Sequence, residues 1–227
     1  MTEIAIYVEG GGDTAQQKAE LRNGFDKLLN SQKQSARSKW LRWKLVPSGG
    51  RDAAYKDFTN AVRQADGETL CVLLVDSEDE LPAELPKSLN ESPEDTTQRK
   101  LTDALARRNH VVNRDNWNLS DIPSEHIHLM VRCMEAWIVS DPDTLASHYR
   151  QGFHANSLPT RPNLEDEAKA SLYDKLQKAT RNTSKGEYAK IKHASRLLGL
   201  IDPKKVAARC PRFATFTSWL DDQIKNA

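Results

Sequence analysis

Three acidic residues follow apolar, strand-like segments of the chain, and carboxylates in such positions could hold a metal ion. Glu9 comes directly after the apolar run 4–8, while Asp76 and Glu78 follow the longer run 70–75. Open α/β sheets place their ligand crevice beyond the carboxyl ends of the strands. Carboxylate oxygens suit Mg²⁺ or Mn²⁺ when the ion must also keep waters and bind phosphate. We therefore predict that the three carboxylates lie within about 8 Å of one another and form a metal site.

The second acid after the run 70–75 has two candidates, Glu78 and Asp79. The i, i+2 spacing of Asp76 and Glu78 can turn both side chains toward one point, which favours Glu78. A structural interpretation competes with the metal site: Asp76 and Glu78 would begin a polar loop, and Glu9 would cap the next helix. The occurrence of acids at two strand ends favours the metal site.

The elements that must position these acids alternate between strand and helix over the first half of the chain. One helix is predicted after the three glycines 10–12, and a second follows Gly49 and Gly50. The run 70–75 is apolar at every position, as in a central strand covered by helices on both faces. The pattern predicts an α/β fold with a mostly parallel, helix-flanked sheet. Its strands are expected at 4–8, 43–46, 70–75 and 127–132, the last running on into Glu135.

The second half of the chain is predicted to be largely helical. Residues 78–95 are acidic and proline-containing, which indicates a surface excursion, and a basic helix is expected around 99–108. Asp141 has the form of an N-cap before a new helix. We predict a Rossmann-like core over 1–145 and a C-terminal helical annex over 146–227 that packs on the core and completes the site. Phe216, Trp219 and Leu220 share one helix face, which is expected to bury the back of the annex.

Composition limits the classes of function. The 227 residues carry a formal net charge of +1, so any contact with a polyanion must be a local patch. The three cysteines have no paired spacing and fit core thiols in a reducing compartment. The apolar run 4–8 is too short for a signal peptide or a membrane span. We expect a cytoplasmic protein that does not contact a membrane.

The acid pattern resembles that of the TOPRIM superfamily, which includes topoisomerases, primases and overcoming-lysogenization-defect type nucleases. The matching elements are Glu9-Gly10 after the first strand and Asp76-Ser77-Glu78 after a later one; Glu78 departs from the usual aspartate. The resemblance implies a TOPRIM fold and a metal-dependent nuclease with Glu9, Asp76 and Glu78 as the metal ligands.

A closer resemblance, spanning nearly the whole chain, is to a small TOPRIM-like family of unknown function encoded beside ATPases in bacterial and phage-defence loci. The pieces that carry it are Val8-Glu9-Gly10, Val75-Asp76, Glu135-Ala136-Trp137-Ile138, Tyr188-Ala189-Lys190 and Arg209-Cys210-Pro211-Arg212-Phe213. It implies that Glu135 and Lys190, or Lys185 in place of Lys190, complete the catalytic set. It also implies an endonuclease acting on DNA or RNA, a partner ATPase, and allows a homo-oligomer. The alternative is a non-catalytic subunit that binds nucleic acid or its partner.

Other patterns carry weaker hypotheses. The glycines 10–12 could cradle a phosphate but lack the ending of a P-loop. His126 and His128 could bind a metal, yet no third ligand is near in sequence, so a packed or surface pair is favoured. The segment 39–44 mixes basic and aromatic residues, as a stacking surface for single strands would, although half-buried strand tryptophans explain it equally well.

Overall fold

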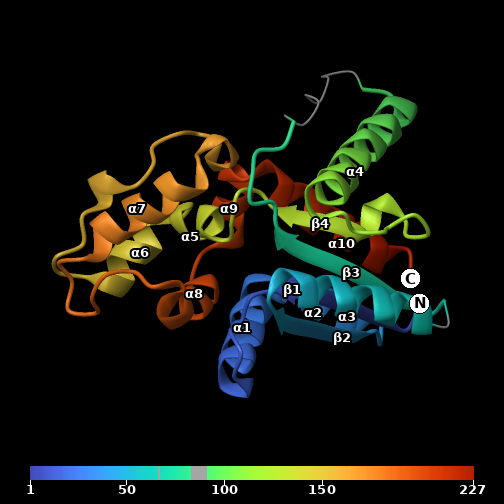
Figure 1. Ribbon diagram of the computed structural model, residues 1–227, viewed down its shortest axis with the longest axis horizontal. Coiled ribbons are helices and arrows are strands. Elements are labelled where there is room, and N and C mark those ends of the chain that lie inside the picture. The colour runs from blue at the N-terminus through green and yellow to red at the C-terminus, as the bar shows by residue number, and fades with distance from the viewer. Residues whose placement is uncertain (66, 83–90) are drawn as a thin grey trace.

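The centre of the molecule is a four-stranded parallel sheet. The structure is a computed structural model that describes residues 1–65, 67–82 and 91–227. The strands stand in the order β2-β1-β3-β4 (Figure 1). Their bounds are β1 Glu3–Glu9, β2 Arg42–Gly49, β3 Thr69–Asp76 and β4 Ile127–Met130. The predicted α/β class and the four strands are confirmed, and the sheet is parallel throughout.

The direction in which the chain crosses the sheet reverses at β1, because β2 lies on one side of β1 and β3 on the other. In open α/β sheets, ligands bind at such a switch point, beyond the carboxyl ends of the strands. Val8 of β1 pairs with Leu74 of β3, so Glu9 and Asp76 leave their strands almost side by side. The topology therefore brings two of the predicted acids to the same place.

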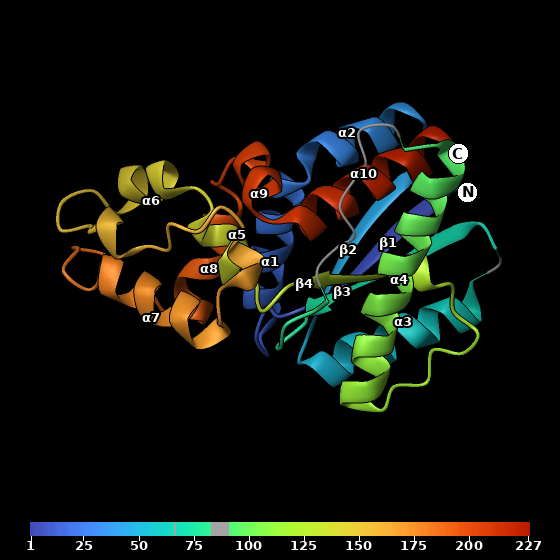
Figure 2. The same cartoon turned by 90° about the horizontal axis from the view of Figure 1, so that it is seen from above.

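Helices cover both faces of the sheet, and alternate strand residues enter two separate apolar clusters. Ile4 and Ile6 pack in the cluster under α1, α2 and α10, whereas Ala5 and Tyr7 pack in the one under α3 and α4. Figure 2 shows α2 and α10 on one side of the sheet and α3 on the other. These helices span α1 Ala15–Leu28, α2 Asn30–Ser38, α3 Arg51–Gln64, α4 Pro93–Asp115 and α10 Pro211–Lys225.

The remaining helices form a lobe beyond one end of the sheet (Figure 1). They span α5 Glu135–Val139, α6 Pro142–Tyr149, α7 Lys169–Thr180, α8 Lys190–Leu198 and α9 Pro203–Arg209, with 3₁₀ turns at Ala155–Ser157 and Leu164–Asp166. A further 3₁₀ turn, Ser124–His126, leads directly into β4. Trp137 joins the lobe to two helices that cover the sheet, since its ring packs against Phe25 of α1 and Phe213 of α10. The expected boundary at residue 145 falls inside α6, and one apolar cluster runs through both regions.

Helix α8 approaches α1 closely because Gly24 has no side chain at the crossing. A methyl group at Gly24 would overlap the backbone carbonyl oxygen of Ser195. This close packing fixes α8 against the core, and the first residue of α8 is Lys190. A glycine in the middle of a helix, unfavourable by itself, thus helps to position a predicted site residue.

Two predictions about elements are wrong, and a third is incomplete. The fourth strand does not run on into Glu135: it ends at Met130, Arg132 adopts a positive φ of 63°, and Glu135 begins α5. The basic helix begins earlier than expected, at Pro93, because proline suits the first helical turn and Ser92 caps it. Helix α10 does contact α9 of the annex, but its apolar face also covers the sheet beside α2 and β4.

Two other sequence predictions concern the acidic surface excursion and the absence of a membrane span. Part of the expected surface excursion, residues 83–90, lies outside the described residues. Within the described ranges, no helix combines the length and the apolar character that crossing a bilayer requires.

Candidate metal centre at the carboxyl edge of the sheet

Glu9, Asp76 and Glu78 each offer one carboxylate oxygen to a common point, and these oxygens lie within 4.8 Å of one another. Glu9 and Asp76 end β1 and β3, and Glu78 follows in the next turn. Glu78 has a positive φ of 68°, and its N–H donates to the carbonyl of Arg132 at 3.1 Å. The predicted proximity of the three acids is confirmed, while their role as metal ligands stays a prediction.

Asp76 is the most deeply buried of the three, with a side chain only 2% exposed. Its Oδ1 accepts a hydrogen bond from the Met134 N–H at 2.9 Å, and its Oδ2 accepts one from Lys190 Nζ at 3.1 Å. Burial raises the pKa of Asp76 above its usual value; Lys190 opposes the increase and Glu135 adds to it. The carboxylate is therefore held firmly where its negative charge is disfavoured, a condition that a bound cation would relieve.

Glu9 shares this condition. Its Oε2 accepts hydrogen bonds from the Asp76 N–H at 3.2 Å and from Arg51 Nη1 at 3.3 Å. Burial, followed by the nearby charge of Asp76, raises the pKa of Glu9 from 4.5 to about 7. Arg51 is itself fixed by Asp115 at 2.7 Å and lies over the ring of Trp117, 5.0 Å from its centroid. Arg51 thus positions Glu9 from the start of α3.

Lys190 links the carboxylates to the helical lobe. Its Nζ lies 3.1 Å from Asp76 Oδ2 and 3.9 Å from Glu135 Oε2. Burial would lower the pKa of Lys190, but Asp76 and Glu135 outweigh this effect and raise it, so the ammonium stays charged. Tyr188 OH donates to Glu135 Oε1 at 2.9 Å and fixes that buried carboxylate. Glu135 and Lys190 therefore reach the cluster as predicted, although Glu135 comes from α5 and not from β4.

The two alternatives left open by the sequence are decided by position. Glu78 belongs to the cluster, whereas Asp79 is 71% exposed and pairs with Arg114. Lys185 lies in an exposed turn before α8. The acid favoured by the i, i+2 spacing and the lysine favoured by the resemblance are thus the ones that lie in the cluster, and their roles stay predictions.

Two basic residues of the site were missed. Arg51 contacts Glu9, and Lys169 Nζ lies 2.5 Å from Glu78 Oε2. Neither belongs to a spacing pattern, since each reaches the cluster only through the packing of its helix. The one available signal was that Arg51 follows a Gly-Gly turn after a strand, where the next helix begins near the same sheet edge.

Two cavities flank Lys190 and lead toward the acids. One of about 580 Å³ is lined by Glu135, Lys169, Tyr173 and Lys190 among others. The other, about 210 Å³, lies between Lys190 and the glycines 10–12. A phosphate-bearing ligand in the larger cavity would meet the ammonium groups of Lys169 and Lys190, which also contact the acid cluster.

The weaker hypotheses fare differently. His128 is buried among aromatic rings, with His126 beside the same tryptophan, as a packed pair would be. In the segment 39–44, Trp40 lies outside the strand and is 93% exposed, and Trp43 donates to Asp26 at 3.0 Å. The interpretation as half-buried strand tryptophans is therefore right for Trp43 and wrong for Trp40.

The fold and the site define an α/β protein with a buried acid cluster at the switch point of a parallel sheet. The chain belongs to the family described as a domain of unknown function, DUF4276, whose model matches residues 8–221. The matched region contains every residue of the cluster, so the site lies within the family's domain. No curated protein and no solved structure matches the chain.

Proposed function

We propose that the protein is a metal-dependent nuclease of TOPRIM type that hydrolyses phosphodiesters of DNA or RNA. The observation that carries this proposal is the convergence of Glu9, Asp76 and Glu78 within 4.8 Å at the switch point, with Lys190 beside them. Carboxylates at this separation can share one Mg²⁺ or Mn²⁺, whose oxygen ligands lie at about 2.1 Å. The raised pKa of Glu9 and Asp76 favours binding of a cation in the same place.

The donor set fits a hard divalent ion. Glu9, Asp76 and Glu78 would hold it, since all three supply oxygen and none of them is a soft ligand. When bound, such an ion supplies an activated water and polarises a phosphoryl oxygen. Met134 N–H and Arg51 keep the carboxylates of Asp76 and Glu9 in place. Their contribution is to orient the ligands in advance of the reaction.

The two lysines of the site provide positive charge for the substrate. Lys190 and Lys169 each contact a carboxylate of the cluster and each line the larger flanking cavity. An ammonium group beside the scissile phosphate stabilises the negative charge that develops on its oxygens in the transition state. An arrangement in which acids hold the metal and lysines contact the phosphate suits phosphodiester hydrolysis. A partner ATPase would supply control, as the family resemblance implies.

A cleavage assay tests the proposal. Purified protein, alone and with an ATPase encoded beside it, is incubated with supercoiled DNA, single-stranded DNA and RNA in Mg²⁺, Mn²⁺ or EDTA. Metal-dependent nicking or degradation is expected, and Asp76→Asn should reduce it to background. The matched control is Asp141→Asn, which also removes a buried, lysine-paired carboxylate but lies outside the cluster. Equal cutting by wild type and Asp76→Asn would defeat the assignment.

A non-catalytic binding subunit is the second candidate, and one observation favours it. Lys190 and Lys169 already form ion pairs with Asp76 and Glu78. If nucleic acid binds with equal affinity in EDTA and in Mg²⁺, and is cut in neither, this second candidate replaces the nuclease.

A further inference from the structure

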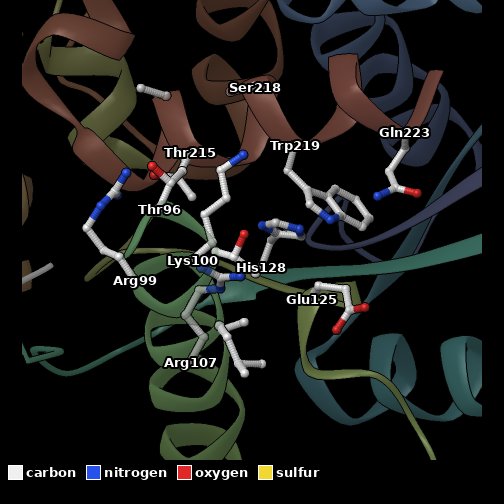
Figure 3. Close-up of a pocket in the computed structure, with 14 residues that line it drawn as sticks. Thr96, Arg99, Lys100, Arg107, Glu125, His128, Thr215, Ser218, Trp219 and Gln223 are labelled. Atoms are coloured by element: carbon white, nitrogen blue, oxygen red, sulfur yellow. The ribbon is translucent and has the colours of Figure 1, made fainter. Parts of the chain in front are cut away.

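A third cavity, which shares no described residue with the acid cluster, lies between α4 and α10 beside β4 (Figure 3). Its volume is about 620 Å³, within the range of roughly 300–1,000 Å³ typical of small-molecule sites. None of the described residues that line it belongs to the acid cluster. Its walls combine aromatic rings, hydroxyl groups and cations, so it has the mixed chemistry of a ligand site.

His128 lines this cavity, and one of its two ring nitrogens, Nε2, is buried without a hydrogen-bond partner among the described residues. The whole residue is 2% exposed. Burial and the charge of Arg107 lower the pKa of His128 well below its usual value, so the ring is neutral. The Glu125 backbone raises that pKa by accepting a hydrogen bond from the ring, and the donor is Nδ1 because Nε2 has no partner. Nε2 therefore presents a lone pair that would accept a hydrogen bond.

An aromatic wall stands beside this acceptor. The ring of Trp219 lies 4.6 Å from that of His128 at an angle of 48°, and both side chains line the cavity (Figure 3). A planar heterocycle stacked on Trp219 would be stabilised, as bases are on aromatic side chains. An exocyclic amine of such a ring could then donate to His128 Nε2. A metal at His128 is disfavoured because the described residues offer no third ligand there.

The α4 side of the cavity carries positive charge and hydroxyl groups. Lys100 and Arg99 come from α4, near Thr96 and Thr97, and Ser218 faces them from α10 (Figure 3). Lys100 pairs with Asp222 at 3.1 Å, but both side chains are about half exposed. Such surface pairs contribute only about 0–1 kcal/mol, so Lys100 can turn to another anion at little cost.

We propose that this cavity binds a purine nucleoside monophosphate. The base stacks on Trp219 and donates from its amine to His128 Nε2, and the phosphate contacts Lys100. The proposal is independent of the nuclease assignment, because it uses other residues and needs no metal.

Titration calorimetry in EDTA tests the proposal, with AMP, adenosine and inorganic phosphate as the probes. EDTA removes any metal-bridged binding at the acid cluster. Wild type should bind AMP about tenfold more tightly than adenosine, a difference of about 1.4 kcal/mol. Lys100→Ala should abolish that preference and leave adenosine binding unchanged, whereas His128→Leu should weaken both ligands at least about tenfold. Asp76→Asn, which alters the acid cluster, should bind AMP as wild type does.

The outcomes that overturn the proposal are distinct. The proposal is wrong if wild type binds no AMP at millimolar concentration, if phosphate alone competes as well as AMP, or if AMP affinity survives Lys100→Ala unchanged. The Lys100 side chain is about half exposed, so Lys100→Ala should fold. This variant therefore tests the proposal even if His128→Leu does not fold.

Discussion

Among the residues that the structure describes, two buried aspartates are each paired with a lysine, and they behave in opposite ways. Asp76 pairs with Lys190 at 3.1 Å in the acid cluster, and Asp141 pairs with Lys205 at 2.7 Å at the start of α6. Burial raises the pKa of Asp76. Burial also acts on Asp141, but hydrogen bonds from Lys205, Thr144 and the Asp202 backbone outweigh it and lower its pKa to about 2.

The difference lies in what surrounds each carboxylate. Asp141 caps α6, and no second buried acid among the described residues shares its lysine. Its negative charge is therefore balanced in the folded protein. Asp76 has Glu9 and Glu135 as close neighbours, so its one lysine does not balance the negative charge. A structural ion pair and a ligand site can therefore contain the same two residue types. The direction of the pKa shift distinguishes them.

The largest predicted difference between the two pairs comes from replacing their lysines, Lys190 and Lys205. Lys190→Met should slow metal-dependent cleavage about 10²–10³-fold, because it removes a charge beside the scissile phosphate. Lys205→Met should leave the rate unchanged and lower the melting temperature instead. Initial rates at saturating Mn²⁺ compare the two variants. Equal slowing of both would mean that Lys190 acts only through stability.

Glu9 sharpens the comparison through stability. Its pKa is about 7 in the folded protein against an ordinary 4.5, so the folded state binds a proton more tightly between those values. The free energy of unfolding must then decrease as the pH rises from 4.5 to about 7, and the whole decrease is present above pH 7. Glu9→Gln should stabilise the metal-free protein at pH 8 by up to about 3 kcal/mol and have little effect below pH 4.5. Urea unfolding in EDTA at several pH values measures this, and a destabilised variant at pH 8 would contradict it.

Asp141 should show the opposite sign and a smaller size. Its pKa is lowered from 3.8 to about 2, so its stabilisation is complete above pH 3.8 and disappears as the pH falls toward 2. Asp141→Asn should therefore lose about 2 kcal/mol at pH 7, and the loss should vanish near pH 2. The same unfolding series detects it. A loss that persists unchanged in acid would point to packing and not to charge.

Much of the fold could be predicted because period and turn chemistry are local properties. The run 70–75 and the glycines after 4–8 identify two strands, and the helix expected after those glycines is α1, which buries Leu21, Phe25 and Leu28. The end of β4 was missed because it depends on a left-handed Arg132, which no local pattern marks. The contact of α10 with the sheet was missed because an apolar helix face does not specify which other face it covers.

The site could be predicted where it lies at strand ends. Glu9 and Asp76 follow from the geometry of parallel sheets, and Glu78 from its spacing. Glu135 and Lys190 came from the resemblance alone, because helices α5 and α8 bring them in by packing. Arg51 and Lys169 could not be found, since their contacts with the acids exist only in the folded chain.

The measurement that tests the central claim most directly is thermal unfolding with and without Mg²⁺ or Mn²⁺ for wild type, Asp76→Asn and Asp141→Asn. A metal that binds only the folded state at 100 times its Kd stabilises by about 2.7 kcal/mol. The account predicts that metal raises the melting temperature of wild type and of Asp141→Asn, but not that of Asp76→Asn. A shift of equal size in all three proteins, or none in wild type, would contradict a metal centre at Glu9, Asp76 and Glu78.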